Sequence, residues 1–457
     1  MATSKKAAGA VANGEEHQID VMPTKELFID MLTRDIALIP AIIDLVDNSA
    51  DGAKRLRESG SFKDLWARVE ISGEEFRIAD NCGGISVDVA EKYAFRFGRP
   101  EGAPFVKHSV GQFGVGMKRA IFKMGRKFRV DSSTTKSKFA VEVNVEAWAK
   151  TKEWKFPFTE REEGVKVTKD ETGTTISVTS LHADVADAFR LANFEIELKN
   201  ELQSRLQDPI SRGLAVTLNQ VPVTAQPLAI LADPRLAPAY KKLRYPESGP
   251  KPVTVKLYCG LGESEDRAAA GWHVFCNGRL ILEGDKTAIT GWGEESDGIS
   301  IPGFHGQYNH LRGYAYFDAD DAGKLPWNTT KTGINTDSAV YRAAKLEMMR
   351  LMRPVVDFLN KLKNEKDQKG PGDEMGPLER LVDKATTAPL TKANTRDVFE
   401  MPKIKAAPVK IGPVMQKIQY SKPLKEVKRA MEALGVSTYT ALGERTFEYF
   451  YKAEVEE

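Results

Sequence analysis

The segment from Val110 to Lys118, V-G-Q-F-G-V-G-M-K, restricts the fold more than any other part of the chain. It carries three glycines within six residues, and an apolar run compatible with a helix, 119–124, follows directly. Glycines allow backbone N–H groups to approach an anion closely, and the start of a helix adds the positive end of its dipole. The segment therefore predicts an anion-binding loop that opens a helix, although a plain glycine-rich turn fits the same residues.

Upstream, residues 41–52 have the periodicity of an amphipathic helix whose buried side is aliphatic. At 3.6 residues per turn, four short polar side chains fall on one face: Asp44, Asp47, Asn48 and Asp51. A solvated face is the ordinary fate of such residues, but no Lys or Arg is paired among them. Carboxylate and amide oxygens are the ligands that Mg²⁺ prefers and shares with phosphates. The face is therefore a candidate Mg²⁺ site.

A further carboxylate ends the alternating segment 76–80. Asp80 is followed by Asn81, Cys82 and the Gly83-Gly84 pair, which indicates a strand running into a turn. A carboxylate at a strand end can accept a hydrogen bond from an amine, such as the exocyclic amine of adenine. The alternative is an Asx-turn that ends a hairpin.

Together these segments resemble the four sequence boxes of the GHKL ATPases, the superfamily of gyrase, the ninety-kilodalton heat-shock chaperones, histidine kinases and MutL. The boxes match, in chain order, at Asp44, Asn48 and Asp51; at Asp80, Gly83 and Gly84; at Gly111, Gly114 and Gly116; and at 171–178. The G-Q-F-G-V-G string is close to the chaperone version. The first box and the Gly-x-Lys after the third look more like the microrchidia ATPases and their bacterial relatives.

The resemblance implies an α+β protein: an N-terminal α/β sandwich of the GHKL (Bergerat) type, a transducer-like α/β domain and a small helical C-terminal tail. It implies ATP and Mg²⁺ as cofactors, with Mg²⁺ on Asn48 and adenine read by Asp80. A lid over the phosphates is expected at roughly residues 86–116. The other expected nucleotide contacts are Asp51, Gly84, Ile85, Gly111, Gln112, Phe113, Gly114, Val115, Gly116, Met117, Lys118 and Thr175.

Two positions depart from the family pattern. Asp44 stands where the family carries a catalytic Glu that orients or deprotonates the attacking water. Because Asp is one methylene shorter than Glu, its carboxylate lies about 1 Å further from the water. Such a shift can lower the rate of hydrolysis on the order of 10²-fold where catalysis depends on positioning. Cys82 replaces the first glycine of the second box, so that contact is expected from Gly83 and Gly84 alone. We therefore expect ATP binding with slow hydrolysis.

The second half of the chain contains two further segments similar to the family. Residues 271–282 read as two apolar strands joined at Asn277-Gly278, and they resemble the V-F-V-N-G-R hairpin of the transducer domain. Residues 325–334 resemble the transducer loop whose lysine, here Lys331, reaches the γ-phosphate. A compact ammonium on a flexible stem can sense that phosphate, although a solvated lysine is the ordinary alternative. The next stretch, 337–363, predicts a long helix with a kink at Pro354.

Composition fits a soluble multidomain protein and argues against a strongly basic nucleic-acid-binding protein, a metal-binding cysteine protein and a membrane protein. A net charge of +2 over 457 residues gives no global attraction to nucleic acid. The three cysteines lack metal-ligand spacing and fit a reducing compartment. No run of 18 apolar residues predicts a membrane span, and the first 18 residues lack the apolar core of a signal peptide. We expect a cytoplasmic protein.

Five regions are expected: a disordered N-terminus at 1–20, an ATP-binding domain at 21–195, a transducer-like domain at 196–362, a basic Pro/Lys-rich linker at 363–420 and a helical segment at 421–457. Residues 401–430 hold eight Lys/Arg and one acid, Glu426, a balance of +7. This stretch could neutralise phosphates of DNA or be a solvated linker. The aromatic residues within 439–451 are expected to form a packing or dimer contact.

Three functions remain open. The first is an ATP-gated homodimer of the microrchidia or gyrase B type that acts on DNA, in compaction, repair or defence. The second is a chaperone-like ATPase, which the missing middle and dimerisation domains disfavour. The third is a kinase of the histidine-kinase type, disfavoured because His17 is the only histidine ahead of the ATP domain.

Overall fold

The computed structural model describes residues 22–58, 60–98, 107–111, 114–226, 228–248, 251–263, 267–369, 374–403 and 418–455. The chain forms two compact units, 1–404 and 405–457. Among the described residues, the larger unit contains two large sheets with helices packed on them and two separate two-stranded sheets, and the smaller unit contains two helices. The α+β class expected from the sequence is confirmed.

The N-terminal half of the larger unit is built on a mixed sheet with the strand order β5-β4-β3-β6-β2-β1-β7-β8. Neighbouring strands are antiparallel except for β1 and β7, which are parallel. The strands are β1 (Trp66–Ile71), β2 (Glu75–Asp80), β3 (Gly125–Ser133), β4 (Ser137–Asn144), β5 (Phe158–Glu163), β6 (Gly173–Leu181), β7 (Ala215–Leu218) and β8 (Val221–Val223).

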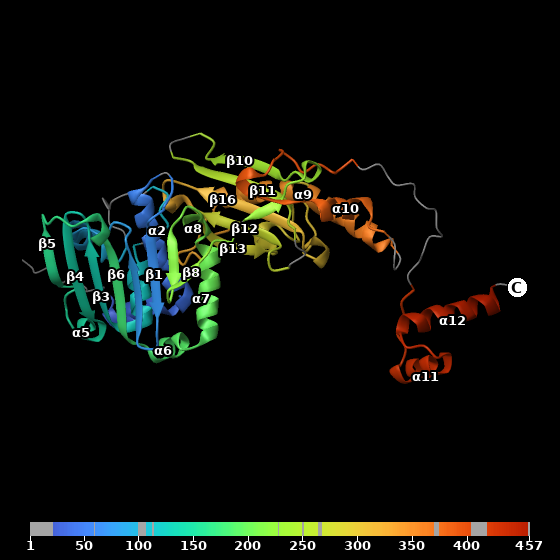
Figure 1. Ribbon diagram of the computed structural model, residues 1–457, viewed down its shortest axis with the longest axis horizontal. Helices are drawn as coiled ribbons and strands as arrows, with labels where there is room; N and C mark the ends of the chain where they lie inside the picture. Colours follow the sequence, from blue (N-terminus) through green and yellow to red (C-terminus); the bar gives the residue numbers. More distant parts are fainter. Residues whose placement is uncertain are drawn as a thin grey trace, which may run out of the picture. The chain divides into compact units, whose positions relative to one another are not determined.

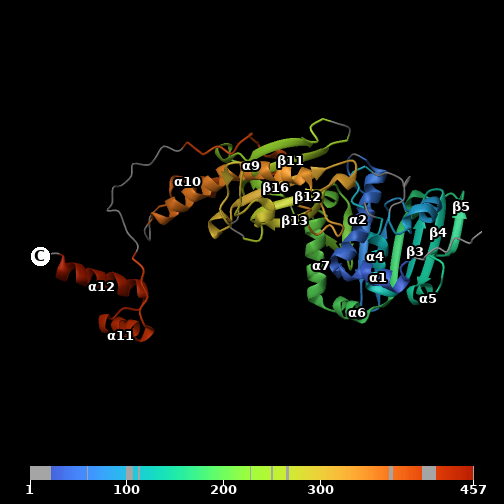
Figure 2. The same ribbon diagram turned by 180° about the vertical axis from the view of Figure 1, so that it is seen from behind.

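Helices cover this sheet and shield its apolar side (Figures 1 and 2). The central helix is α2 (Leu38–Leu56), whose Ile42 and Val46 are fully buried because they recur at helical spacing on the sheet-facing side. The others are α1 (Lys25–Arg34), α3 (Val87–Val89), the π-helical turn η1 (Ala90–Ala94), α4 (Gly116–Met124), α5 (Val145–Ala149), α6 (Ala183–Phe189), α7 (Ala192–Arg205) and α8 (Gln207–Ser211).

The second sheet has the order β10-β11-β16-β12-β13, with β12 and β16 parallel. Its strands are β10 (Ala239–Tyr245), β11 (Val253–Leu261), β12 (Gly271–Cys276), β13 (Arg279–Asp285) and β16 (Leu311–Asp318). The predicted hairpin is confirmed: β12 and β13 meet at Asn277 and Gly278, whose φ angles of 48° and 82° suit an Asn-Gly turn. The short strands β14 (Glu295–Ser296) and β15 (Ile299–Ser300) form a separate ribbon.

Helix α9 (Ala339–Asp367) packs along one face of the second sheet, which confirms the long helix predicted at 337–363 (Figure 2). Pro354 lies inside this helix, and the kink expected there stays a prediction. The residues after it differ from the linker expected at 363–420. Residues 374–403 include α10 (Pro377–Lys384) and β17 (Thr387–Pro389), which pairs with β9 (Ala229–Leu231). Leu381, Leu390 and Phe399 are buried in the core, so isolated apolar residues in a polar stretch fold this segment onto the unit.

The smaller unit consists of α11 (Leu424–Leu434) and α12 (Tyr439–Glu454). Gly435 ends α11 in the left-handed conformation, with φ at 63°. Neither helix has a buried residue, and the aromatic side chains of α12 are exposed. Among the described residues, no helix is long and apolar enough to cross a membrane.

Candidate functional site

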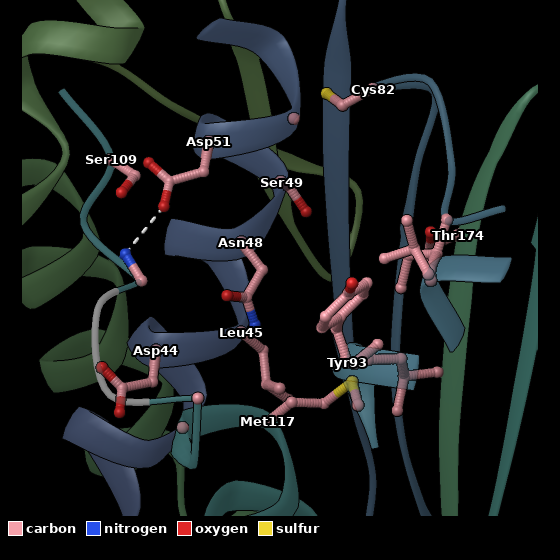
Figure 3. A pocket seen from close by; sticks show the side chains of 18 of the residues that line it. Asp44, Leu45, Asn48, Ser49, Asp51, Cys82, Tyr93, Ser109, Met117 and Thr174 are labelled. Carbon is pink, nitrogen blue, oxygen red and sulfur yellow. Dashed lines mark hydrogen bonds between the residues drawn. The ribbon is translucent and has the colours of Figure 1, made fainter. Parts of the chain in front are cut away.

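A cavity of about 500 Å³ lies where the sequence boxes meet (Figure 3). Its walls come from α2, the end of β2, the segment after β2, the glycine loop that opens α4, and β6. The loop that carries Lys331 closes one side. This volume is within the range of about 300–1,000 Å³ that suits a small organic ligand.

One end of the cavity presents the carboxylate of Asp80 against apolar neighbours. Ser49 donates its hydroxyl to Oδ2 of Asp80 at 2.8 Å, and the backbone N–H of Cys82 donates to Oδ1 at 2.8 Å. Burial raises the pKa of Asp80, an effect that these hydrogen bonds only partly offset. The carboxylate is thus fixed in orientation, and its free lone pairs are suited to an amine donor.

Cys82 contributes through its backbone rather than its thiol. The side chain is 1% exposed and its Sγ lies 3.8 Å from the carbonyl oxygen of Trp66. Burial raises the pKa of the thiol far above its usual range, which leaves it unreactive. The departure from glycine at this position therefore preserves the backbone contact to Asp80.

At two of the glycines a Cβ would meet a close neighbour. Gly84 has a φ of +67°, and a Cβ there would lie 2.0 Å from the carbonyl oxygen of Ser133. A Cβ at Gly116 would lie 3.2 Å from Oδ2 of Asp44 and would fill the space in front of that carboxylate. Glycine at these positions keeps the cavity open on both sides.

Asp51 holds the loop that precedes the glycines. Its carboxylate accepts the backbone N–H groups of Val110 at 2.9 Å and Gly111 at 2.7 Å (Figure 3). Lys54 lies 3.6 Å away and donates to the carbonyl oxygens of His108 and Asn277. Asp51 therefore positions the base of the expected lid, and its oxygens are already engaged.

Five buried charged side chains, which we term the ion cluster, adjoin the other end of the cavity, and the first three of them line it: Asp44, Arg119, Lys331, Asp47 and Arg279. Lys331 donates to Asp44 at 2.9 Å and to Asp47 at 3.4 Å. Arg119 binds the other oxygen of Asp44 at 2.8 Å, and Arg279 binds Asp47 at 2.9 Å. The expectation that the acidic face of α2 lacks basic partners is therefore wrong, because its partners come from distant segments that the helical pattern does not include.

The ion cluster shifts the pKa values of its members. Burial alone would raise the pKa of Asp44, but the charges of Lys331 and Arg279 outweigh it, so the pKa is lowered. Burial likewise opposes the charge on Lys331, yet Asp44 and Asp47 raise its pKa above the usual value. Both groups are therefore charged at neutral pH.

The ion cluster also carries a surplus positive charge, because three cations face two carboxylates. The buried Nε atoms of Arg119 and Arg279 have no hydrogen-bond partner within the described part of the chain. Arg119, Lys331 and Asp44 line the cavity. Buried charge without a counter-charge is unfavourable, so this end of the cavity favours an anion.

Lys118 is a further cation, outside the ion cluster, and it lies beside the glycine loop. Its Nζ donates to the carbonyl oxygens of Ala94, at 2.9 Å, and Gly114. Burial lowers its pKa to about 7. The side chain thus links the segment after β2 to the glycine loop, and its charge is poised to change near neutral pH.

Asn48 lies on α2 between Asp44 and Asp51 and lines the cavity, a position that suits a ligand of Mg²⁺ (Figure 3). Unlike its carboxylate neighbours it is exposed, and it lines the cavity beside the glycine loop. Within the described ranges, no group of three or more His, Cys, Asp or Glu could hold a metal ion. A single protein oxygen is compatible with Mg²⁺, which keeps several waters and is held largely by phosphates.

Most of the predicted site residues line one cavity: Asp44, Asn48, Asp51, Asp80, Gly84, Ile85, Gly111, Gly114, Val115, Gly116, Met117, Lys118 and Lys331. Gln112 and Phe113 lie outside the described residues. Thr175 is placed wrongly, because strand alternation turns Thr174 and Ile176 toward the cavity instead. The sequence interpretation missed Ser49, Arg119 and Arg279, although Arg119 directly follows Lys118 and Arg279 follows the Asn277-Gly278 turn.

Comparison with known families agrees with this geometry. Residues 36–174 match the family described as histidine kinase-, DNA gyrase B-, and HSP90-like ATPase. The match covers the cavity residues of α2, β2, the glycine loop and Thr174, and it supports a GHKL-type domain that binds and hydrolyses ATP. A comparison with curated proteins finds no match to the chain.

Proposed function

We propose that the cavity binds Mg²⁺–ATP with Asp80 on adenine and the ion cluster on the terminal phosphate, and that hydrolysis is slow. We further propose that ATP controls pairing of two copies of the chain, as in a microrchidia-type ATPase acting on DNA. One observation carries this proposal. The same cavity offers an oriented carboxylate at one end and surplus buried positive charge at the other, which complements a ligand with an amine at one end and phosphates at the other.

The phosphates are expected against the glycine loop and the start of α4 (Gly116–Met124). Lys118 and Arg119 lie in the first turn of that helix and supply cationic donors. Asn48 would hold Mg²⁺, which neutralises charge on the phosphates when it is bound. Asp51 keeps the loop in place through the N–H groups of Val110 and Gly111.

Asp44 is suited to orient the attacking water rather than to remove its proton. Each of its oxygens already accepts from a cation, Lys331 on one side and Arg119 on the other. The lowered pKa makes the carboxylate a weak base. Slow turnover follows from this environment as well as from the shorter side chain.

Calorimetric titration with ATP tests the adenine assignment. Asp80→Asn replaces one acceptor oxygen by an amide donor, so most nucleotide affinity should be lost. Asp184→Asn, an exposed carboxylate on α6, is the matched control and should bind as the unmodified chain does. Unchanged ATP affinity in Asp80→Asn would show that Asp80 does not bind the adenine base.

The metal assignment has its own test. Asn48→Ala should weaken ATP binding in the presence of magnesium and leave it nearly unchanged when EDTA is present. An equal loss under both conditions would assign Asn48 to the nucleotide or to folding rather than to the metal.

A further inference from the structure

A second and larger hollow, of about 1,320 Å³, borders the loop that Asp51 holds, at Lys107 and His108. It is lined by the end of α2, residues 107–108, α8 and the second sheet. Arg55 borders both hollows, but the nucleotide-site residues Asp44, Asp80 and Lys331 do not line the larger one. Its volume exceeds the roughly 300–1,000 Å³ that accommodates one drug-sized molecule, so it suits a segment of a polymer.

The floor of this groove is the face of the second sheet that α9 leaves open. Residues paired directly across neighbouring strands share a face. The register pairs Tyr240 with Tyr258, Lys242 with Lys256, and Lys256 with Tyr316. These side chains therefore lie on one face, while Val255, Leu257 and Phe317 of the other face pack into the core with α9.

The aromatic rings of this face form a continuous series. Tyr240 and Tyr258 have ring centroids 4.8 Å apart, and Tyr258 and Tyr316 are 6.3 Å apart. Phe275 stacks on Tyr316 at 4.7 Å. Tyr258 and Tyr316 line the groove and are half-buried, so parts of both rings remain available. Half-buried aromatic rings on a strand face are suitable platforms for unstacked bases.

The groove is more basic than acidic, since its lining holds six Lys/Arg and four Asp/Glu. Three of the acids already have a basic neighbour: Asp318 with Lys256 at 3.1 Å, Asp320 with His108 at 3.4 Å and Asp208 with Arg212 at 3.7 Å. Lys107 and Lys242 are exposed at the groove. Two exposed ammonium groups beside aromatic rings favour a polymer that carries both phosphates and rings.

We propose that this groove binds single-stranded nucleic acid, with bases against Tyr258 and Tyr316 and the backbone on Lys107 and Lys242. This proposal rests on the proposed function in one respect, which is that the partner of the protein is a nucleic acid. A duplex keeps its bases stacked inside and cannot use the rings, so a single strand is the favoured form. Nucleotide binding and strand binding use different residues, so each can fail without the other.

Fluorescence anisotropy of the full chain tests the proposal without added nucleotide. The probes are labelled thymidine and uridine oligonucleotides of about 12 residues, a length within the site sizes of such surfaces, and a duplex of the same length. Both single strands should bind more tightly than the duplex, and the thymidine–uridine difference tells DNA from RNA. Tighter binding of the duplex, or no binding of any probe, would overturn the proposal.

Variants then locate the surface. Tyr258→Leu should weaken strand binding about fivefold or more, the lower limit for loss of one stacked base. Lys242→Ala, an exposed change that cannot disturb the core, should lower the slope of log affinity against log salt by about 0.7. Lys152→Ala, an exposed lysine of the first half, is the control and should change neither quantity. ATP affinity should be unchanged in all three variants.

The basic stretch near α11 is the competing location. Lys425→Ala combined with Lys428→Ala removes two of its exposed cations. If this pair abolishes strand binding while Tyr258→Leu and Lys242→Ala retain it, the groove is not the binding surface. If the groove variants lose binding and the α11 pair does not, the assignment stands.

Discussion

Lys331 and Asp44 are 287 positions apart in the chain, yet the ammonium of one lies 2.9 Å from the carboxylate of the other. Asp47, one turn further along α2, lies 3.4 Å from the same ammonium. The loop that carries Lys331 follows the second sheet, whereas α2 belongs to the first half of the chain. This buried contact therefore ties the two halves together at the floor of the cavity.

The first prediction concerns turnover. Asp44→Asn keeps the shape of the side chain but removes the charge that faces Lys331 and Arg119. Hydrolysis should fall at least 10²-fold because the oriented carboxylate is lost, while ATP binding persists because the cluster becomes more positive. Steady-state hydrolysis combined with calorimetry measures both quantities. Turnover at the unmodified rate would mean that another group, such as Asp47, orients the water.

The second prediction concerns the stability of the ion cluster. Asp44→Ala leaves three buried cations with one carboxylate and should cost about 3–5 kcal/mol. Arg119→Met leaves two cations with two carboxylates, so its cost should be smaller, about 1–3 kcal/mol. Urea denaturation gives the free energy of unfolding for both. The reverse order of stability would contradict the view that the cluster carries surplus positive charge.

The helices and turns that local sequence patterns specify could be predicted. The contacts between residues far apart in the chain could not. The aliphatic spacing of Ile42 and Val46 predicts α2, and the Asn277-Gly278 pair predicts the β12–β13 turn. The ion cluster joins α2, α4, the hairpin and the loop of Lys331, and no local pattern encodes which distant cation faces which carboxylate. Residues 374–403 appeared to be a linker because only scattered apolar residues, such as Leu381 and Phe399, anchor them.

The third prediction is a pH effect on nucleotide binding. Burial lowers the pKa of Lys118 to about 7, and bound phosphates should raise it by favouring the charged form. Between these two pKa values, ATP binding should take up a proton, so ATP affinity should fall as pH rises above about 7. Calorimetry at pH 8 in two buffers of different ionisation enthalpy measures the uptake. Lys118→Met should abolish it, and equal heats in both buffers for the unmodified chain would contradict the prediction.

The fourth prediction concerns the output of ATP binding. Lys331 is 5% exposed and is held by Asp44 and Asp47. A γ-phosphate placed in the cavity competes with both carboxylates for its ammonium, whereas ADP lacks that group. Because only a ligand with different affinities for two states can shift them, a non-hydrolysable ATP analogue should raise the dimer fraction and ADP should not. Sedimentation velocity at several protein concentrations measures this fraction.

The matched variants for this prediction are Lys331→Ala and Lys324→Ala, the latter an exposed lysine that precedes the same loop. Lys331→Ala should remove the difference between the analogue and ADP while ADP affinity stays within about threefold, because the β-phosphate contacts of the glycine loop remain. Lys324→Ala should dimerise as the unmodified chain does. If Lys331→Ala still dimerises with the analogue, or if the unmodified chain stays monomeric with every nucleotide, Lys331 does not couple the phosphate to assembly.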